Sequence, residues 1–271
     1  MKVLVLDTTH GGDVIARRFR AEGDDVTCVD VYRNCPEEKK AGLREDEIRV
    51  VDSVPEGRYD LAVMPAHCPR SFLGDSDVCE VISFSQAVGR FIDDRRFRIE
   101  VTGVKGKTSA CYILAKILFD SGRRVLLHSS RGEGPWTDHG HRIDRKVSIA
   151  PPYLMTLPAG DYDAVVCEVS LGGSGKADIA LITNLAEDYG IAKNTFKASD
   201  AKKDIFTDGV DIVPLDEVEF WSRWCDHLTG YPQRVRAVSE PRLGEGLRVS
   251  VDYEGVSEIV LDGSYVSTEY L

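Results

Sequence analysis

The segment 97–101, in which Phe97, Ile99 and Val101 are apolar, is expected to form a strand and leads directly into a turn with two glycines, and a largely apolar segment follows at 109–119. The turn reads Thr102-Gly103-Val104-Lys105-Gly106-Lys107-Thr108-Ser109. A strand, a glycine turn and a helix in this order form a loop whose backbone N–H groups and helix N-terminus attract phosphate. In such a loop Lys107 reaches the β- and γ-phosphates, and the Thr108 hydroxyl holds Mg²⁺. We therefore predict that the chain uses a nucleoside triphosphate.

The glycine spacing of this loop differs from the common pattern G-x-x-x-x-G-K-[ST], because Val101 stands at the position of the first glycine. An alternative is a simple helix start, with Thr108 as the cap and Lys107 solvated. The coincidence of strand, paired glycines and helix favours the phosphate-binding interpretation.

The composition excludes several classes of protein. The chain has 271 residues, enough for two domains, and its formal net charge of −11 argues against binding to a nucleic acid backbone. No apolar run approaches the ~18 residues that a membrane span needs, and the N-terminal run is too short for a signal peptide. We expect a cytoplasmic protein that contacts neither nucleic acid nor membrane. The sequence leaves the oligomeric state open.

Seven cysteines are scattered along the chain and never occur as C-x-x-C. An odd number without metal-site spacing indicates neither a disulfide framework nor a zinc site. We expect reduced and mostly buried thiols.

Two α/β domains are predicted from the alternation of strands and helices. The polar run at 93–96 separates a small Rossmann-like domain, residues 1–96, from a larger doubly wound domain, residues 97–271. In the first domain we expect strands at 2–7, 26–30, 48–51, 61–64 and 80–83, with helices at 13–22 and 86–92. In the second we expect strands at 97–101, 124–128, 164–169, 179–184 and 210–213, helices at 109–119, 200–206 and 216–228, a glycine-rich loop at 129–140, and a β-meander at 247–253, 256–261 and 265–268.

A magnesium ion beside Thr108 needs a carboxylate at the end of a neighbouring strand. Glu168 ends the apolar run that begins at Ala164, so we predict that it binds the metal. A strand-end glutamate on the surface is the alternative.

Four ordered segments resemble the motif series of the Mur ligase superfamily over about residues 97–271. They are the loop at 102–108, then Glu168-Val169-Ser170, then the segment 182–188, and then Ala201-Lys202-Lys203-Asp204-Ile205-Phe206. The resemblance implies a ligase that uses ATP and Mg²⁺ to convert a substrate carboxylate into an acyl phosphate, which a nucleophile then attacks.

By the same resemblance, catalysis is assigned to Lys107, Glu168 and Lys202, and Asn184 lies near the nucleotide. Lys107 would stabilise the transferring phosphoryl group, and Thr108 with Glu168 would hold Mg²⁺. Lys202 matches a family lysine that is often carbamylated to bridge a second metal, with a solvated helix lysine as the alternative.

The chain departs from the family pattern at three points. Lys105 stands where many members have asparagine, and Tyr189 stands where a metal-binding histidine commonly occurs, which puts the second metal in question. The sequence also ends where the third, C-terminal domain of the family would begin, so we expect that domain to be absent from this chain.

The first domain resembles the Mur-ligase-like coenzyme F(430) synthetases of methanogenic archaea in its segments 3–12 and 25–32. That resemblance implies a nickel tetrapyrrole acid as the small-molecule substrate and closure of a carbocyclic ring. We expect the substrate between the domains, contacted by His10, Gly11 and Gly12 and by the loop 129–141. A hydrogen-bonded turn residue is the alternative for His10, and His139 and His141 are expected to be solvated.

Two other functions stay open. The first is a different Mur-type ligase that forms an amide. The second is an ATP-binding module without turnover, which the expected absence of the closing domain favours.

Overall fold

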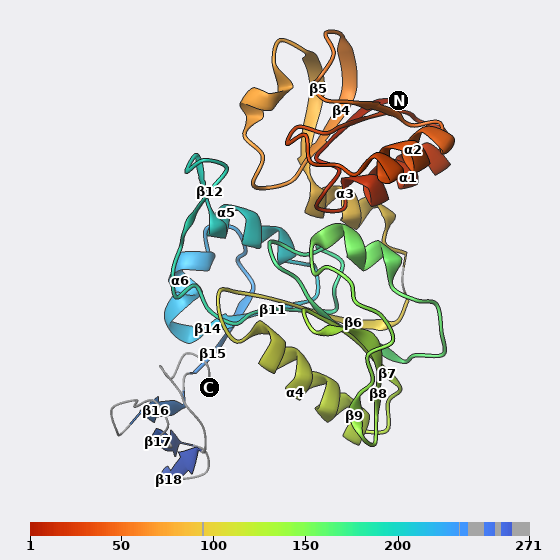
Figure 1. Ribbon diagram of the computed structural model, residues 1–271. Coiled ribbons are helices and arrows are strands. Elements are labelled where there is room, and N and C mark those ends of the chain that lie inside the picture. Colours follow the sequence, from red (N-terminus) through yellow and green to blue (C-terminus); the bar gives the residue numbers. More distant parts are fainter. Residues whose placement is uncertain (94, 233, 238–246, 253–255, 262–271) are drawn as a thin grey trace.

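The computed structural model describes residues 1–271 except 94, 233, 238–246, 253–255 and 262–271. Two separate parallel sheets dominate it, and one lies above the other in the view of Figure 1. Among the described residues, no helix reaches the length and apolar character that a bilayer span requires.

The first sheet is wholly parallel and has the strand order β3-β2-β1-β4-β5. Its strands are β1 (Lys2–Leu6), β2 (Asp25–Val29), β3 (Arg49–Val51), β4 (Arg58–Met64) and β5 (Asp77–Ser83). The helices of this unit are α1 (Gly12–Ala21), α2 (Glu37–Glu45), the 3₁₀ turn η1 (Arg70–Leu73) and α3 (Phe84–Phe91). The strand order reverses at β1, so the loops after β1 and β4 meet where open α/β sheets bind ligands.

The second sheet has the order β15-β14-β11-β6-β10-β7-β8-β9. Its strands are β6 (Phe97–Thr102), β7 (Val125–Ser129), β8 (Gly132–Thr137), β9 (Gly140–His141), β10 (Ala164–Glu168), β11 (Ile179–Ile182), β14 (Val210–Pro214) and β15 (Leu228–Tyr231). Strands β15 to β7 are parallel, whereas β8 and β9 add an antiparallel edge. The central strand β6 has β10 and β11 on its two sides, so the loops after these three strands come together. These two parallel sheets confirm the predicted α/β class.

The remaining helices and strands lie outside these two sets of elements. They are α4 (Lys107–Asp120), η2 (Pro151–Thr156), β12 (Gly190–Ile191), β13 (Phe196–Lys197), α5 (Ala198–Lys202), η3 (Lys203–Ile205), η4 (Leu215–Glu217), α6 (Val218–Trp221), β16 (Val235–Ala237), β17 (Leu247–Asp252) and β18 (Val256–Leu261).

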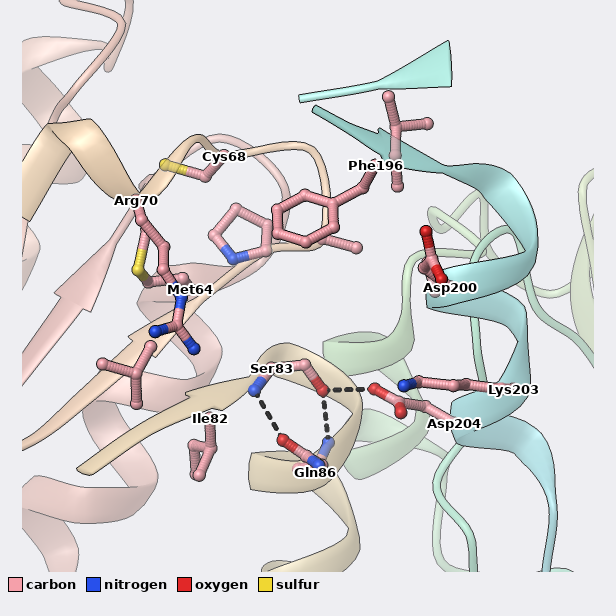
Figure 2. Close-up of a pocket in the computed structure, with 15 residues that line it drawn as sticks. Met64, Cys68, Arg70, Ile82, Ser83, Gln86, Phe196, Asp200, Lys203 and Asp204 are labelled. Atoms are coloured by element: carbon pink, nitrogen blue, oxygen red, sulfur yellow. Dashed lines mark hydrogen bonds between the residues drawn. The ribbon is translucent and has the colours of Figure 1, made fainter. Parts of the chain in front are cut away.

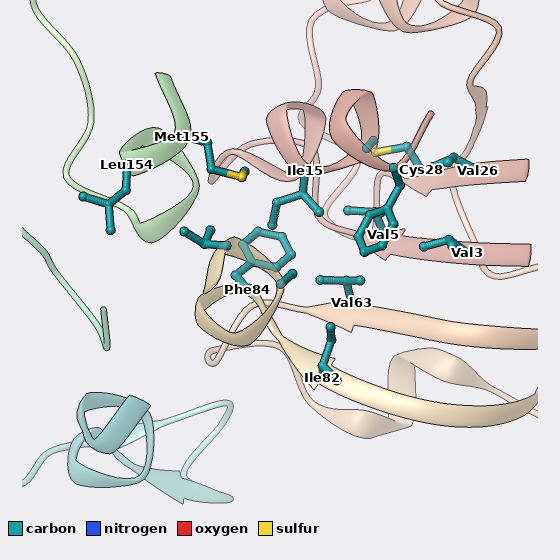
Figure 3. Close-up of a cluster of buried hydrophobic side chains, with 14 of the residues drawn as sticks. Val3, Val5, Ile15, Val26, Cys28, Val63, Ile82, Phe84, Leu154 and Met155 are labelled. Atoms are coloured by element: carbon teal, nitrogen blue, oxygen red, sulfur yellow. The ribbon is translucent and has the colours of Figure 1, made fainter. Parts of the chain in front are cut away.

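One apolar cluster joins the two units (Figure 3). Val5, Ile15 and Phe84 of the first unit belong to the same buried cluster as Leu154 and Met155 of η2. Helix α3 carries Phe84, and its start is fixed by a capping box in which the Ser83 hydroxyl accepts from the Gln86 N–H. Each such buried side chain contributes about 1.5–3 kcal/mol to stability. The two sheets are therefore packed together by hydrophobic burial.

The helix α2 was not predicted. Leu43 is the only buried residue of this helix, so the sequence has no apolar periodicity there from which a helix could be predicted.

The expected loop at 129–140 is wrong, because β8 pairs with β7 there. Its glycines mark close backbone approach: a Cβ on Gly134 would lie 2.0 Å from the carbonyl oxygen of Arg142.

The helix expected at 216–228 is also shorter than predicted. Only Val218–Trp221 is α-helical, and Leu228–Tyr231 forms the edge strand β15. In contrast, two strands of the expected meander are confirmed as the antiparallel pair β17 and β18. The third strand of that prediction, at 265–268, lies outside the described residues.

Candidate nucleotide site and the inter-domain cavities

The loop between β6 and α4 turns at two glycines with positive φ, Gly103 at 139° and Gly106 at 79°. A Cβ on Gly103 would lie 2.0 Å from the Thr183 Oγ1 atom. Only glycine fits a left-handed backbone this close to a neighbouring strand end. The predicted loop therefore exists with the tight backbone that phosphate binding requires.

Lys107 begins α4, and Gly106 is its N-cap without a side-chain cap. The Lys107 ammonium folds back and donates to the carbonyl oxygens of Gly103 at 3.2 Å and Val104 at 3.4 Å. The alternative of a capping Thr108 and a solvated Lys107 is therefore wrong. Ser109 lies one residue further along α4 and is exposed.

Thr108 and Glu168 form the predicted pair. The Thr108 hydroxyl lies 3.1 and 3.0 Å from Glu168 Oε1 and Oε2, and the Ser130 N–H donates to Oε2 at 2.9 Å. Glu168 is 2% exposed, which excludes the surface-residue alternative. A hydroxyl and a buried carboxylate at a helix start are the oxygen donors that Mg²⁺ prefers.

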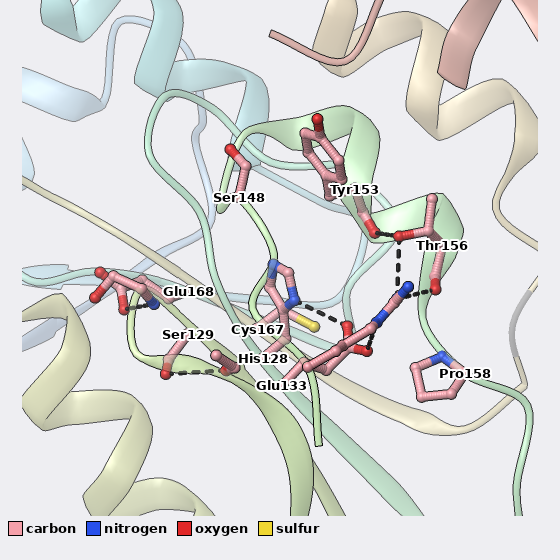
Figure 4. Close-up of polar contacts among 12 residues, drawn as sticks. His128, Ser129, Glu133, Ser148, Tyr153, Thr156, Pro158, Cys167 and Glu168 are labelled. Carbon is pink, nitrogen blue, oxygen red and sulfur yellow. Dashed lines mark hydrogen bonds and ion pairs between the residues drawn. The ribbon is translucent and has the colours of Figure 1, made fainter. Parts of the chain in front are cut away.

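A polar network supports the turn that carries Ser130 (Figure 4). His128 Nδ1 lies 3.0 Å from Glu133 Oε2, and the Arg145 Nε donates to Glu133 Oε1 at 2.6 Å. Burial alone would raise the pKa of Glu133, but its hydrogen bonds to His128 and Arg145 outweigh burial and keep the pKa below its usual range. The β7–β8 hairpin is thereby fixed beside Glu168.

Asn184 holds the phosphate loop in place through hydrogen bonds to the backbone of the loop. Its side chain accepts from the Lys105 N–H at 3.2 Å and donates to the Lys105 carbonyl at 3.1 Å, while its own carbonyl accepts from the Val104 N–H at 3.0 Å. The structure thus places Asn184 next to the predicted nucleotide loop, as a clamp on three backbone groups.

Lys202 is fully buried at 0% exposure, so the solvated alternative is wrong. Its ammonium donates to the carbonyl oxygens of Gly103 at 2.9 Å and Ser170 at 3.1 Å, and it lies 3.4 Å from the Thr102 hydroxyl. Burial first, and the nearby Lys107 charge second, lower the pKa of Lys202 to about 7. A lysine with this pKa is partly neutral at physiological pH and is therefore nucleophilic.

The segment before α5 is anchored by Asp188. Its carboxylate accepts from the Ser199 N–H and hydroxyl, both at 2.9 Å. Tyr189 is 39% exposed.

The first unit contributes a cluster at the end of β1. Asp7 Oδ2 lies 3.2 Å from His67 Nε2 and also forms a short contact with His10 Nδ1. His10 therefore makes the hydrogen bond of the alternative interpretation, and it also lines a cavity between the two units. Asp7 and His67 were not predicted, although both follow apolar strands whose ends meet in a parallel sheet.

Gly11 and Gly12 have packing roles. A Cβ on Gly11 would lie 2.7 Å from the Pro152 Cβ, and one on Gly12 would lie 1.8 Å from the Asp7 carbonyl oxygen.

Two cavities lie between the units, of about 270 and 280 Å³. Figure 2 shows the first, with Ser83 donating to Asp204 Oδ2 at 2.5 Å across it. His10 lines the second, opposite residues 150–151, 170–171, 201 and 204. The expected contribution of loop 129–141 to this region is wrong, because that segment forms the sheet edge. Within it, His141 packs on Tyr112, 2.9 Å from the hydroxyl, and only His139 is exposed as expected.

Two proteins of known function are similar to this chain in sequence. No protein-family model matches the chain. A coenzyme F(430) synthetase from Methanosarcina acetivorans is 36% identical over 223 residues, covering 74% of this chain and 46% of the relative. One from Methanocaldococcus jannaschii is 29% identical over 218 residues, covering 74% and 48%.

Among solved structures, the chain aligns with a UDP-N-acetylmuramate:L-alanyl-γ-D-glutamyl-meso-diaminopimelate ligase from Neisseria meningitides, at 12% identity and a TM-score of 0.47, covering 100% of this chain and 90% of that one. The chain spans about half the length of the curated relatives it matches. By its sequence, this chain is a relative of the coenzyme F(430) synthetases, as its motifs indicated.

Proposed function

We propose that this chain carries the ATP-binding part of a ligase that activates a substrate carboxylate. A carboxylate oxygen attacks the γ-phosphorus of ATP, the bond to the β,γ-bridging oxygen breaks, and an acyl phosphate and ADP result. The observation that carries the proposal is the Thr108–Glu168 pair beside a loop that also holds Lys107 and the buried Lys202. Such a site works by positioning and charge neutralisation.

Each residue has a distinct role in this proposal. Thr108 and Glu168 would hold Mg²⁺, which neutralises charge on the phosphates when bound. Lys107 would leave the loop carbonyls to contact the transferring phosphoryl group. Asn184 keeps the loop backbone in place through Lys105 and Val104, so it orients the nucleotide indirectly.

Lys202 bears on the second metal that Tyr189 puts in question. Its amine has a pKa of about 7, so a neutral fraction is available to add to CO₂ and form a carbamate with loss of one proton. The carbamate oxygens would then be metal ligands next to Gly103. Tyr189 supplies no imidazole here, so Lys202 would carry this role with Asp188 nearby.

The substrate is inferred from the relatives. We infer a nickel tetrapyrrole acid whose activated side chain is attacked by a ring carbon: the carbon–carbon bond of a carbocycle forms, the acyl C–O bond breaks to release phosphate, and the ring carbon loses a proton. The cavities between the units are its site in this proposal, since Ser83, Asp204 and His10 line them from two sides. The boundary between domains 1–96 and 97–271 belongs to the same proposal.

Two measurements test the proposal. The first is ATP binding with Mg²⁺, comparing the chain with Lys107→Ala and with Lys116→Ala, a surface lysine of the same helix. We expect Lys107→Ala to lose at least about tenfold in affinity and Lys116→Ala to stay unchanged. Equal binding by all three would contradict the nucleotide site.

The second measurement is phosphate release with the seco nickel-tetrapyrrole acid, in the protein that carries this sequence. Turnover with this acid, abolished by Lys107→Ala, supports ring closure. Turnover only with added acceptor amines would identify an amide-forming ligase, and tight ATP binding without any turnover would identify a binding module.

A further inference from the structure

Among the described residues, two groups of three side chains have ligand atoms close enough to share one metal ion. They are Asp7 with His10 and His67, and Asp211 with Cys225 and His227. In the second group, the Asp211 carboxylate already accepts from the Thr207 N–H at 3.2 and 3.3 Å and from the Cys225 thiol at 3.3 Å. The Asp211 carboxylate is therefore already used to connect Thr207 and Cys225 within the structure.

In the group of Asp7, His10 and His67, the two carboxylate oxygens of Asp7 have different partners. Oδ1 accepts the Thr9 N–H at 2.7 Å, which fixes the orientation of the carboxylate. Oδ2 faces both imidazoles, His10 through Nδ1 and His67 through Nε2. Asp7 itself is 0% exposed, with φ at 77°, so the carboxylate is held rigidly at the end of β1.

The two imidazoles are also held in place by ring contacts. The His10 and His67 rings pack edge to face with centroids 4.5 Å apart, and the Tyr32 ring stacks on His67 at 5.9 Å. Gly12 closes the turn against the Asp7 carbonyl, which sets the position of His10. The three side chains therefore come from two separate loops, and Tyr32 from a third loop stacks on them, so that the cluster has a fixed shape.

We propose that Asp7, His10 and His67 bind one divalent first-row transition ion, such as Zn²⁺, Co²⁺ or Ni²⁺. Two imidazoles with one carboxylate form a donor set that binds such ions in preference to Mg²⁺ or Ca²⁺. Metal–ligand bonds of about 2.0–2.2 Å place neighbouring ligand atoms about 3–3.5 Å apart. The 3.2 Å between Asp7 Oδ2 and His67 Nε2 agrees with this spacing. The ion takes up the ring nitrogens that face Asp7, and each imidazole carries its proton on the other nitrogen.

An ion held by His10 and His67 would lie at the wall of the second cavity between the units. His10 and His67 both line it, and the opposite wall comes from Ser170, Ala201 and Asp204 of the second unit. One carboxylate leaves a bound divalent ion with a net positive charge, so the open positions take an oxygen anion such as a carboxylate. This site is separate from the nucleotide loop and goes beyond the proposed ligase activity, and its cavity is one of the two proposed above for the substrate.

The test is a Co²⁺ titration followed by visible absorption and by calorimetry. It uses His227→Ala as the starting variant, so that the Asp211 group does not contribute. We expect one equivalent of Co²⁺ to bind, with affinity reduced at least about 100-fold by His67→Ala or His10→Ala in that background. His139→Ala, which removes an exposed histidine, is the matched control and should change nothing.

Urea unfolding of each variant verifies that the fold is retained. Binding of no Co²⁺ at millimolar concentration in the starting variant would overturn the proposal. The proposal would also be overturned if His67→Ala and His10→Ala left the Co²⁺ affinity of the starting variant unchanged. It would be overturned as well if the unmodified chain bound Co²⁺ and His227→Ala abolished that binding.

Discussion

The hydroxyl of Thr108 lies within hydrogen-bond distance of both carboxylate oxygens of Glu168, at 3.1 and 3.0 Å, although 60 positions separate the two residues. The sheet brings them together, because β10 pairs in parallel with β6 and aligns Glu168 with Val101. The carboxylate therefore stands at the level where the phosphate loop begins.

Replacing Glu168 by glutamine tests this pair. Glu168→Gln keeps the shape of the side chain but removes its charge, so Mg²⁺ is held less tightly. If the proposed ligase activity holds, we expect ATP turnover to fall about 100-fold or more, with an unchanged circular dichroism spectrum. Asp120→Asn, a surface change at the end of α4, should leave turnover intact. Equal turnover by both variants would contradict a metal role for Glu168.

The stability of the chain should depend on pH through Lys202. The pKa of Lys202 is about 7 in the folded chain and 10.5 as its ordinary value. Between these values the unfolded chain binds more protons, so the free energy of unfolding rises with pH from about 7 to 10.5. Below pH 7 the lysine is protonated in both states, and the full cost of burying its charge is present.

Lys202→Met removes this titration. We expect the wild type to gain stability relative to the variant between pH 7 and 10, on the order of a few kcal/mol. Urea unfolding at several pH values measures this slope. Lys116→Met serves as the exposed control and should follow the wild type; parallel curves for all three proteins would contradict a lowered pKa.

A methyl group at Gly103 should disrupt the loop. Gly103→Ala combines a φ of 139° with a Cβ only 2.0 Å from Thr183 Oγ1, so we expect a loss of about 2 kcal/mol or more. Gly122→Ala is matched to it, because Gly122 has φ at 86° but nothing within 4 Å of the added Cβ. That variant should lose only about 1 kcal/mol from backbone strain. Thermal unfolding compares the two, and equal losses would contradict the steric argument.

The thiols should differ in reactivity. Six of the seven cysteines are buried and free, and only Cys79 is exposed. Burial raises the pKa of Cys167 to about 12, which keeps its thiol protonated and unreactive. With a thiol reagent, we expect one rapid equivalent from the native chain, none from Cys79→Ser, and seven from the unfolded wild type. Rapid reaction of a second thiol would contradict the described burial.

Much of the frame could be predicted because its signals are local. The segment from β6 to α4 could be predicted from the alternating apolar residues of the strand, the two glycines and the helix, and the structure differs from the prediction by only one or two residues there. Prediction failed where local signals mislead. The glycines of β8 suggested a loop but permit close strand contact, and α2 has a single buried residue.

The candidate site shows the same division. Thr108 and Glu168 could be paired from the sequence, since Glu168 ends one strand, Thr108 follows the loop after another, and both strand ends were expected at the same sheet edge. The burial of Lys202 could not, because it depends on α5 lying over the Gly103 carbonyl. His67 carried no motif at all, and it meets Asp7 only because β4 lies beside β1.

The sequence by itself determined most of the strands and helices, the phosphate loop and the residue types available for its chemistry, because these follow from apolar periodicity and from glycine's freedom at positive φ. The tertiary structure alone decided the strand order of each sheet, the lowered pKa of Lys202 and the meeting of His10 with His67 at Asp7. These properties depend on desolvation and on contacts between distant segments, which arise only when the chain packs.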